Sequence, residues 1–225
     1  MIPWKLLDTA QTPGDGSELR LYERDNEFSI KVGNYELMNS RVYGSEDALG
    51  KLGCQKIAKH PRARVLIGGL GMGYTVRSAL DELGDTAQVA VAELIPEVVQ
   101  WNRGALAGLA GHPLDDERVS VHEFDVAELI KTPEGGYNAI LLDVDNGPQG
   151  LTVKENDWLY SPNGLDTTFA ALKPKGVLAV WSSGPEAAFA KRLRRVGFEV
   201  EEVGLRARGK GKGGAHYTVY LAERS

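Results

Sequence analysis

From Arg64 onward, short apolar runs alternate with segments of helical pattern, and this alternation constrains the fold more than any other feature of the chain. Five apolar runs predict strands at Arg64–Gly68, Ala87–Glu93, Arg118–Phe124, Tyr137–Asp143 and Gly176–Ser182. Helices are predicted between and after them at Thr75–Leu83, Pro96–Leu106, Asp125–Lys131, Leu165–Leu172 and Pro185–Val196. Near-continuous apolar strands separated by helices are typical of a parallel sheet covered on both faces.

The end of the chain departs from this pattern. Phe198–Arg206 and His216–Arg224 predict two strands with no helix between them, which implies an antiparallel pair at the edge of the sheet. The fold class is therefore α/β, with a doubly wound, mostly parallel sheet of seven strands. The basic loop Arg206–Lys212 between the last two strands is expected to be solvated, with contact to a phosphate or an acidic partner as the alternative.

Alternating apolar residues also mark the N-terminal segment. Three strands are predicted, at Glu18–Arg24, Glu27–Val32 and Tyr35–Asn39, and turn-prone pairs join them. This is a small antiparallel hairpin or meander, too short to be stable alone, so we expect it to pack on the rest of the chain or on a second subunit of a homodimer.

A helix is predicted at Ser45–His60, with Ser45 as its N-cap. We expect it to open the second of two parts, so that residues 1–44 form the N-terminal β segment and residues 45–225 the catalytic domain.

Composition narrows the class of protein. The chain has 225 residues, 42% of them hydrophobic, and a formal net charge of −5, so bulk electrostatics do not indicate nucleic-acid or membrane binding. A single cysteine, Cys54, excludes an internal disulfide and a cysteine-based zinc cluster, and the four histidines are too scattered to predict a metal site. We expect a cytoplasmic enzyme or binding protein.

A glycine-rich loop follows the first parallel strand and opens the next helix. Gly68, Gly69, Gly71 and Gly73 leave the backbone bare at the carboxyl end of a strand, where ligands bind in such sheets and where a helix N-terminus offers free N–H groups. The alternative is a tight turn with no ligand. The pattern is G-x-G-x-G, and Tyr74 and Val76 stand where a dinucleotide fingerprint needs its third glycine. This departure weakens the prediction of an NAD-linked oxidoreductase.

Acidic residues stand at the tips of the next three strands. Glu93 can accept two hydrogen bonds from a ribose diol, or it is an exposed strand-end carboxylate. Asp125 can accept the exocyclic amine of an adenine, or it is a helix N-cap. Asp143 can act as the base for an amine nucleophile, with Asp145 as its helper or as an anchor for a cationic substrate. The alternative for Asp143 is a cap of the following loop.

A further acidic and aromatic cluster follows the fourth strand and suits an amine or another cation. It comprises Glu155, Asp157, Trp158 and Tyr160, and a solvated acidic loop is the alternative. The segment Trp181-Ser182-Ser183, at the tip of the fifth strand, is expected to complete the wall of the site, although an aromatic there is more often part of a core.

Four segments in this order resemble the class I S-adenosylmethionine-dependent transferases and, among them, the spermidine synthase (aminopropyltransferase) family. They read "VLIGGLGMGYTVR", "VAELIPEVV", "YNAILLDVDNGP" and "LKPKGVLAV". The resemblance implies a sheet order of 3-2-1-4-5-7-6 with the last strand antiparallel. It also implies that Gly69, Gly71 and Gly73 face the amino-acid end of S-adenosylmethionine or its decarboxylated form, beside Met72, Leu94 and Val126.

The resemblance is closer in the cofactor half than in the polyamine half. Spermidine synthases usually carry an acidic residue where this chain has Gly71, and an aromatic-His/Gln-Glu stretch where it has Ala48-Leu49-Gly50-Lys51. The sequence therefore favours methyl transfer to a small amine-bearing molecule, with aminopropyl transfer as the alternative. The segment after strand four lacks the Asn-Pro-Pro-aromatic motif of adenine-amino methylases of nucleic acids. An NAD-linked oxidoreductase and a non-catalytic cofactor-binding domain are the further alternatives.

Overall fold

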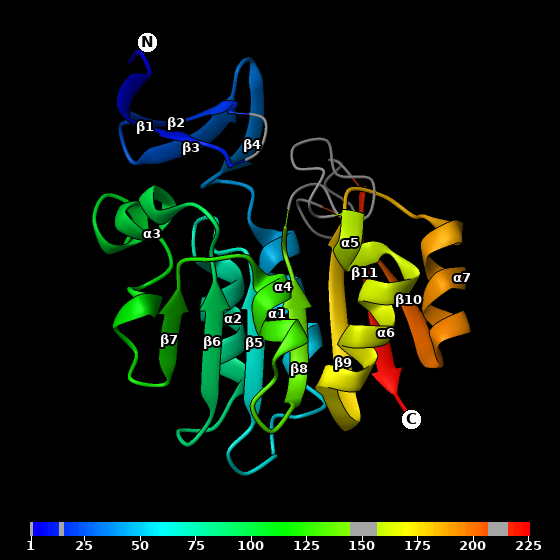
Figure 1. Cartoon of the computed structure of the whole chain (residues 1–225). Helices are drawn as coiled ribbons and strands as arrows, with labels where there is room; N and C mark the ends of the chain where they lie inside the picture. Colours follow the sequence, from blue (N-terminus) through cyan, green and yellow to red (C-terminus); the bar gives the residue numbers. More distant parts are fainter. Residues whose placement is uncertain (1, 14–15, 145–156, 207–215) are drawn as a thin grey trace.

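A seven-stranded sheet forms the centre of the computed structural model, which describes residues 2–13, 16–144, 157–206 and 216–225 (Figure 1). Its order is β10-β11-β9-β8-β5-β6-β7. The strands are β5 (Arg64–Gly68), β6 (Gln88–Ala92), β7 (Val119–His122), β8 (Tyr137–Leu142), β9 (Leu172–Ser182), β10 (Phe198–Arg206) and β11 (His216–Arg224). β5 to β9 pair in parallel, and β11 is antiparallel to both of its neighbours. The expected order and the antiparallel last strand are confirmed.

Helices cover both faces of this sheet. One face carries α1 (Gly44–Cys54), α2 (Tyr74–Glu82) and α3 (Pro96–Arg103), and the other carries α4 (Val126–Lys131), α5 (Asp157–Tyr160), α6 (Pro162–Ala171) and α7 (Ala187–Val196). A short 3-10 helix, η1, spans Pro113–Asp115. Consecutive residues of β8 pack on opposite faces of the sheet. Leu141 belongs to the hydrophobic cluster beneath α1 and α2, whereas Leu142 belongs to the cluster beneath α4 and α6. Burial on both faces explains the near-continuous apolar runs of the strands.

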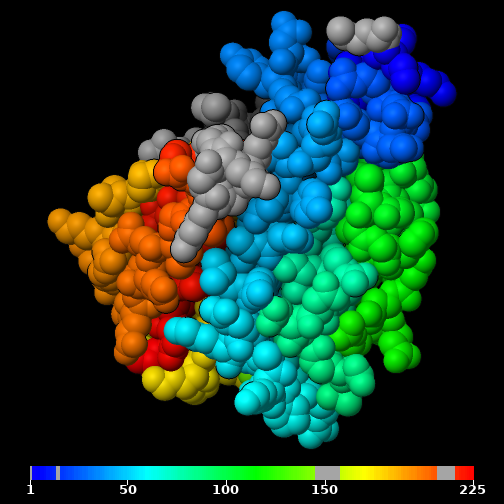
Figure 2. All heavy atoms as spheres, turned by 180° about the vertical axis from the view of Figure 1, so that it is seen from behind, coloured from blue at the N-terminus to red at the C-terminus, as the bar shows by residue number. Residues whose placement is uncertain are grey.

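The N-terminal segment forms a separate antiparallel sheet of four strands in the order β1-β2-β3-β4. These are β1 (Lys5–Gln11), β2 (Glu18–Arg24), β3 (Glu27–Val32) and β4 (Tyr35–Asn39). The last three have the predicted bounds, and β1 is an addition to the prediction. Figure 1 shows this sheet above the carboxyl ends of the parallel strands, and Figure 2 shows it from behind, seated on the body of the molecule.

Specific contacts hold the N-terminal sheet in place. The Trp101 indole N–H donates to Asp8 Oδ2 at 2.8 Å, and the Tyr74 hydroxyl donates to the Ser40 carbonyl at 3.2 Å. Leu21 and Ile30 belong to the same hydrophobic cluster as the first face of the large sheet. The expected packing of this segment on the rest of the chain is confirmed, whereas the division at residue 44 stays a prediction.

The start and end of α1 differ from the expectation. Ser45 is not the N-cap: the helix begins at Gly44, Tyr43 takes the capping position, and the Ser45 hydroxyl donates to Glu46 Oε2 at 2.5 Å. The helix also ends at Cys54 rather than His60. The prediction was wrong because the chain enters the helix one residue earlier, which turns the Ser45 hydroxyl toward a neighbouring side chain.

Candidate functional site

The loop between β5 and α2 requires glycine for reasons of backbone geometry. Gly69, Gly71 and Gly73 have φ values of +88°, +52° and +83°, a region that residues with a side chain rarely adopt. A Cβ at Gly69 would collide with the carbonyl oxygen of Asp143, and one at Gly71 would lie 2.6 Å from Met38 Sδ. The bare backbone therefore lets β8 and the N-terminal sheet approach this loop closely.

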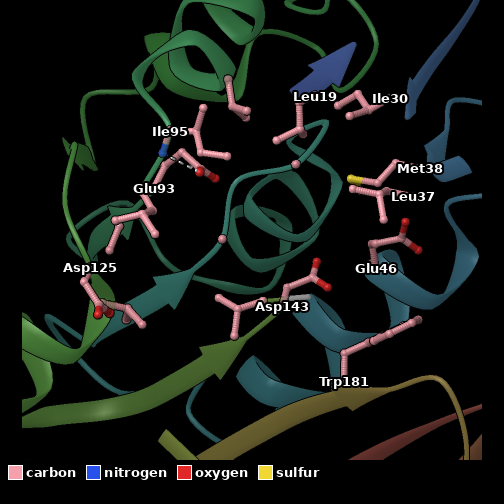
Figure 3. Close-up of a pocket in the computed structure, with 17 residues that line it drawn as sticks. Leu19, Ile30, Leu37, Met38, Glu46, Glu93, Ile95, Asp125, Asp143 and Trp181 are labelled. Atoms are coloured by element: carbon pink, nitrogen blue, oxygen red, sulfur yellow. Dashed lines mark hydrogen bonds between the residues drawn. The ribbon is translucent and has the colours of Figure 1, made fainter. Parts of the chain in front are cut away.

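A cavity of about 200 Å³ lies beyond the carboxyl ends of β5, β6 and β8, beneath the N-terminal sheet (Figure 3). Most of the residues that the sequence assigns to cofactor binding line it: Gly69, Gly71, Glu93, Leu94, Asp125, Val126 and Asp143. The structure thus brings together residues from three strand tips and the glycine loop. The roof is apolar and comes from the N-terminal sheet, through Leu19, Ile30, Leu37 and Met38.

Two predicted site residues are not among the described residues that line the cavity. Met72 is buried in the core beneath α2 rather than in the cavity wall. Gly73 is the N-cap of α2, and a Cβ there would lie 3.1 Å from both Asn102 Oδ1 and Pro113, so this glycine serves packing. Asp145 lies outside the described residues.

Glu93 anchors the glycine loop to the strand beside it. Its Oε2 accepts the N–H of Leu70 and its Oε1 accepts the N–H of Ile95, both at 2.9 Å. The side chain is buried, so the alternative of an exposed strand-end carboxylate is wrong. A carboxylate offers about four acceptor positions, so these backbone bonds are compatible with a ribose diol at the same group.

Asp125 serves as the N-cap of α4 and also faces the cavity. Its Oδ1 accepts the N–H of Ala127 at 2.8 Å, which confirms the capping alternative. Capping uses only one carboxylate oxygen, so the cap is compatible with a bond from an adenine amine to the other oxygen. That role stays a prediction.

Asp143 follows β8 and is the carboxylate whose chemistry departs most from that of an exposed Asp. Its N–H donates to the Gly68 carbonyl at 2.9 Å, and the Thr75 hydroxyl donates to its Oδ2 at 2.7 Å. Burial, and then the nearby charge of Glu46, raise the pKa of Asp143 from 3.8 to about 7, against the opposing effect of the Thr75 bond. A carboxyl group with this pKa can exchange protons at neutral pH.

Glu46 is the site residue that the sequence analysis missed. It comes from the first turn of α1 and lines the same cavity as Asp143 (Figure 3). Burial raises the pKa of Glu46 as well. The segment Ser45-Glu46-Asp47 resembles the acidic pair that spermidine synthases carry at this point of the chain, but the packing of α1 on α2 is what places Glu46 near β8.

Only the two aromatic residues of the acidic and aromatic segment after strand four can be placed in the structure. Glu155 and the side chain of Asp157 lie outside the described residues. Trp158 lies under the Lys131 ammonium, 4.9 Å from its ring centre, and Tyr160 is buried against Phe189, so both belong to the second core. Trp181 does line the cavity as expected.

The electrostatic character of the cavity follows from its lining. Four carboxyl groups face it, those of Glu46, Glu93, Asp125 and Asp143, and no Lys, Arg or His is among the described residues that line it. This surrounding favours a cationic ligand. Elsewhere in the described chain, no cluster of three or more His, Cys, Asp or Glu side chains is arranged to hold a metal ion, and none of the helices found there combines the length and apolar character of a membrane span.

Comparison with known proteins shows which solved structures share this fold. No family model matches the chain, and no curated protein matches its sequence. Among solved structures, a spermidine synthase in complex with the transition-state analogue AdoDATO is similar, with a TM-score of 0.76 and 16% identity over 98% of this chain and 73% of the other. The spermidine synthase of Thermotoga maritima gives a TM-score of 0.77 with the same identity and coverage.

A probable spermidine synthase from Corynebacterium glutamicum is also similar, with a TM-score of 0.64 and 14% identity over 98% of this chain and 80% of the other. Together with the sheet order and the N-terminal antiparallel sheet, these likenesses show that the chain has the spermidine synthase-like α/β fold.

Proposed function

We propose that this protein is a transferase that moves a carbon group from a sulfonium donor of the S-adenosylmethionine type to a small amine. The observation that carries the proposal is Asp143: a carboxyl group with a pKa of about 7, at a strand tip, in an acidic cavity beside a glycine loop. The fold shared with spermidine synthases supports a transferase over an NAD-linked oxidoreductase.

The residues present fit a donor of this kind. We assign the ribose hydroxyl groups to Glu93 and the adenine amine to Asp125, because both residues line the cavity. Gly69 and Gly71 present backbone without side chains to the remaining part of the donor. The donor supplies a carbon next to a positively charged sulfur, and the protein has to hold a nucleophile close to that carbon and in line with it.

Asp143 has the properties of the base in this reaction. An amine attacks only when it is neutral, so a nearby carboxylate that accepts its proton promotes the reaction. With a pKa of about 7, Asp143 is ionised in a large fraction of molecules at neutral pH, yet it binds a proton far more strongly than an exposed Asp does. This combination suits a group that takes a proton from an amine during turnover.

The charge of the cavity favours the decarboxylated donor, and hence aminopropyl transfer. S-adenosylmethionine carries a carboxylate that decarboxylated S-adenosylmethionine lacks, and the described cavity lining has four carboxyl groups but no basic side chain. Bringing a further negative charge into such a site is unfavourable. Methyl transfer is the second candidate, because Gly71 leaves the glycine loop without the acidic residue that spermidine synthases usually carry there.

Calorimetric titration with S-adenosylmethionine, decarboxylated S-adenosylmethionine and NAD in parallel tests this proposal. We expect the decarboxylated donor to bind most tightly, and at 100 times its dissociation constant it should stabilise the fold by about 2.7 kcal/mol. Preference for S-adenosylmethionine would favour methyl transfer instead. Binding of NAD alone, or of none of the three, would contradict the proposal.

Assays with a panel of small amines then identify the acceptor. Asp143→Asn should abolish turnover while donor binding persists. If it leaves both turnover and binding unchanged, Asp143 is not the base.

A further inference from the structure

Close packing of α1 on α2 places the first turn of α1 at the cavity. A Cβ at Gly50 would lie 2.6 Å from the Thr75 carbonyl oxygen, so the two helix backbones are in direct contact there. The Ser78 hydroxyl donates to the Asp47 carbonyl at 2.6 Å and ties the same turn to α2. The position of Glu46 is therefore fixed by two helices and not by a loop.

Thr75 connects this turn to Asp143. Its hydroxyl oxygen lies 2.7 Å from Asp143 Oδ2 and 3.4 Å from the Glu46 carbonyl oxygen, and its single proton goes to the nearer acceptor. The Ser45 hydroxyl donates to the Glu46 carboxylate at 2.5 Å. Glu46 of α1 and Asp143 at the end of β8 thus line one cavity, and each carboxyl group accepts a hydrogen bond from a hydroxyl.

Glu46 has three further titratable neighbours. Asp47 on α1 adds a negative charge near Glu46, and Tyr217 on β11 and Tyr74 on α2 are phenols whose pKa values rise partly because of the Glu46 charge. No basic side chain is among the described cavity-lining residues to offset these charges. Two like charges in a buried site oppose each other, so the two carboxyl groups lose their protons in separate steps.

We infer that Glu46 is the proton-sharing partner of Asp143: the two carboxyl groups hold one proton between them, and Glu46 thereby makes Asp143 a stronger base toward the substrate amine. This inference rests on the proposed function and adds a positioning residue to it. Glu46 acts through Asp143 and is distinct from the acidic residue that the glycine loop lacks.

The proton balance of the reaction is simple. The ionised member of the pair takes one proton from the substrate ammonium, which leaves a neutral amine and two protonated carboxyl groups. The amine lone pair then forms the new N–C bond while the C–S bond breaks. The electron pair of the C–S bond stays on the sulfur and converts the sulfonium to a neutral thioether. The product amine carries the positive charge that the sulfur loses, and the pair afterwards returns its extra proton to solvent.

Titration of the ligand-free protein tests the pair without any assumption about substrate. Carbon-13 labelling of Asp and Glu carboxyl groups allows NMR to follow Asp143 from pH 4 to 9 in the wild type, in Glu46→Gln and in the control Asp47→Asn. We expect Glu46→Gln to lower the Asp143 midpoint by about one pH unit and Asp47→Asn to change it much less. An unchanged midpoint in Glu46→Gln, or equal shifts in both variants, would overturn the inference.

The pH dependence of kcat/KM provides the second readout, with decarboxylated S-adenosylmethionine as the donor. In Glu46→Gln the acid limb should move to lower pH by the same amount as the NMR midpoint, whereas a merely structural residue would lower the whole profile. If no donor supports turnover, the proposed function fails, but the ligand-free titration still decides whether the two carboxyl groups share a proton. The two failures are therefore distinguishable.

Discussion

The Thr75 hydroxyl donates a 2.7 Å hydrogen bond to Asp143 Oδ2, and this bond joins the first turn of α2 to the tip of β8. The bond stabilises the ionised form of Asp143, whereas burial and the charge of Glu46 stabilise the protonated form. The result is a pKa near neutrality. Thr75 thus controls both the orientation of the carboxylate and its readiness to bind a proton.

Thr75→Val should therefore shift the activity profile of the enzyme. Loss of the donor removes the one contact that lowers the Asp143 pKa, so we expect the acid limb of kcat/KM to move to higher pH. The lost hydrogen bond should cost about 1 kcal/mol of stability. Thr167→Val is the matched control, since it makes the same substitution on α6, where the hydroxyl bonds only the backbone carbonyl of Asn163. An identical profile in both variants would show that Thr75 has no special influence on Asp143.

Asp143→Asn should stabilise the fold at neutral and alkaline pH. Between pH 4 and 7 the folded state binds more protons than the unfolded state, because the Asp143 pKa rises from 3.8 to about 7 on folding. Wild-type stability therefore falls as the pH rises through this range, and the penalty persists above it. Urea unfolding should show the variant to be about 2–4 kcal/mol more stable at pH 8 and no more stable near pH 4. A gain that is independent of pH would contradict this origin.

Gly69→Ala should damage both the fold and the site. The added methyl group would collide with the Asp143 carbonyl, and the φ of +88° is strained for alanine. We expect a loss of stability of about 1–3 kcal/mol in chemical denaturation, together with weaker donor binding. Gly84→Ala is the control, because open space surrounds that position, and it should change stability by less than about 0.5 kcal/mol. Equal effects at both glycines would mean that the close approach at Gly69 is unimportant.

Glu93→Ala should loosen the glycine loop from β6. The N–H groups of Leu70 and Ile95 would lose their acceptor, at a cost of about 1–3 kcal/mol for each group left buried and unpaired. Thermal unfolding and donor titration should both show the effect. The neighbouring Glu97→Ala removes the same charge from the first turn of α3 and should leave donor affinity near that of the wild type. Donor binding by Glu93→Ala at wild-type strength would refute a ribose-binding role.

Local pattern was sufficient to predict much of the fold. β2 to β4 appear with the predicted bounds because apolar alternation and turn residues define them without help from the rest of the chain. β1 escaped prediction because Lys5–Gln11 is largely exposed and its pairing with β2 is irregular between Leu6 and Asp8, so it shows no clean alternation. Its place as an edge strand depends on β2, not on its own sequence.

Long-range packing explains what the sequence missed at the site. Glu93, Asp125 and Asp143 lie close together because the carboxyl ends of parallel strands meet at one edge of the sheet. This rule can be applied from the sequence alone. Glu46 joins them only because Gly50 permits contact between α1 and α2, and no periodicity encodes that contact. Gly73 was assigned to the cofactor from its motif, yet its neighbours Asn102 and Pro113 come from distant segments that only the structure places beside it.

The apolar roof has a consequence for how this protein responds to a ligand. Leu19, Ile30, Leu37 and Met38 belong to the N-terminal sheet, so a molecule that fills the cavity contacts residues of both sheets. Ligand binding in the cavity and packing of the N-terminal sheet on the rest of the molecule are then coupled. Each stabilises the other by the same free energy. The amides of β2 and β3 should accordingly exchange with solvent more slowly in the presence of ligand, although those strands lie far along the sequence from the glycine loop. Amide exchange in the small sheet therefore measures ligand binding at the large one.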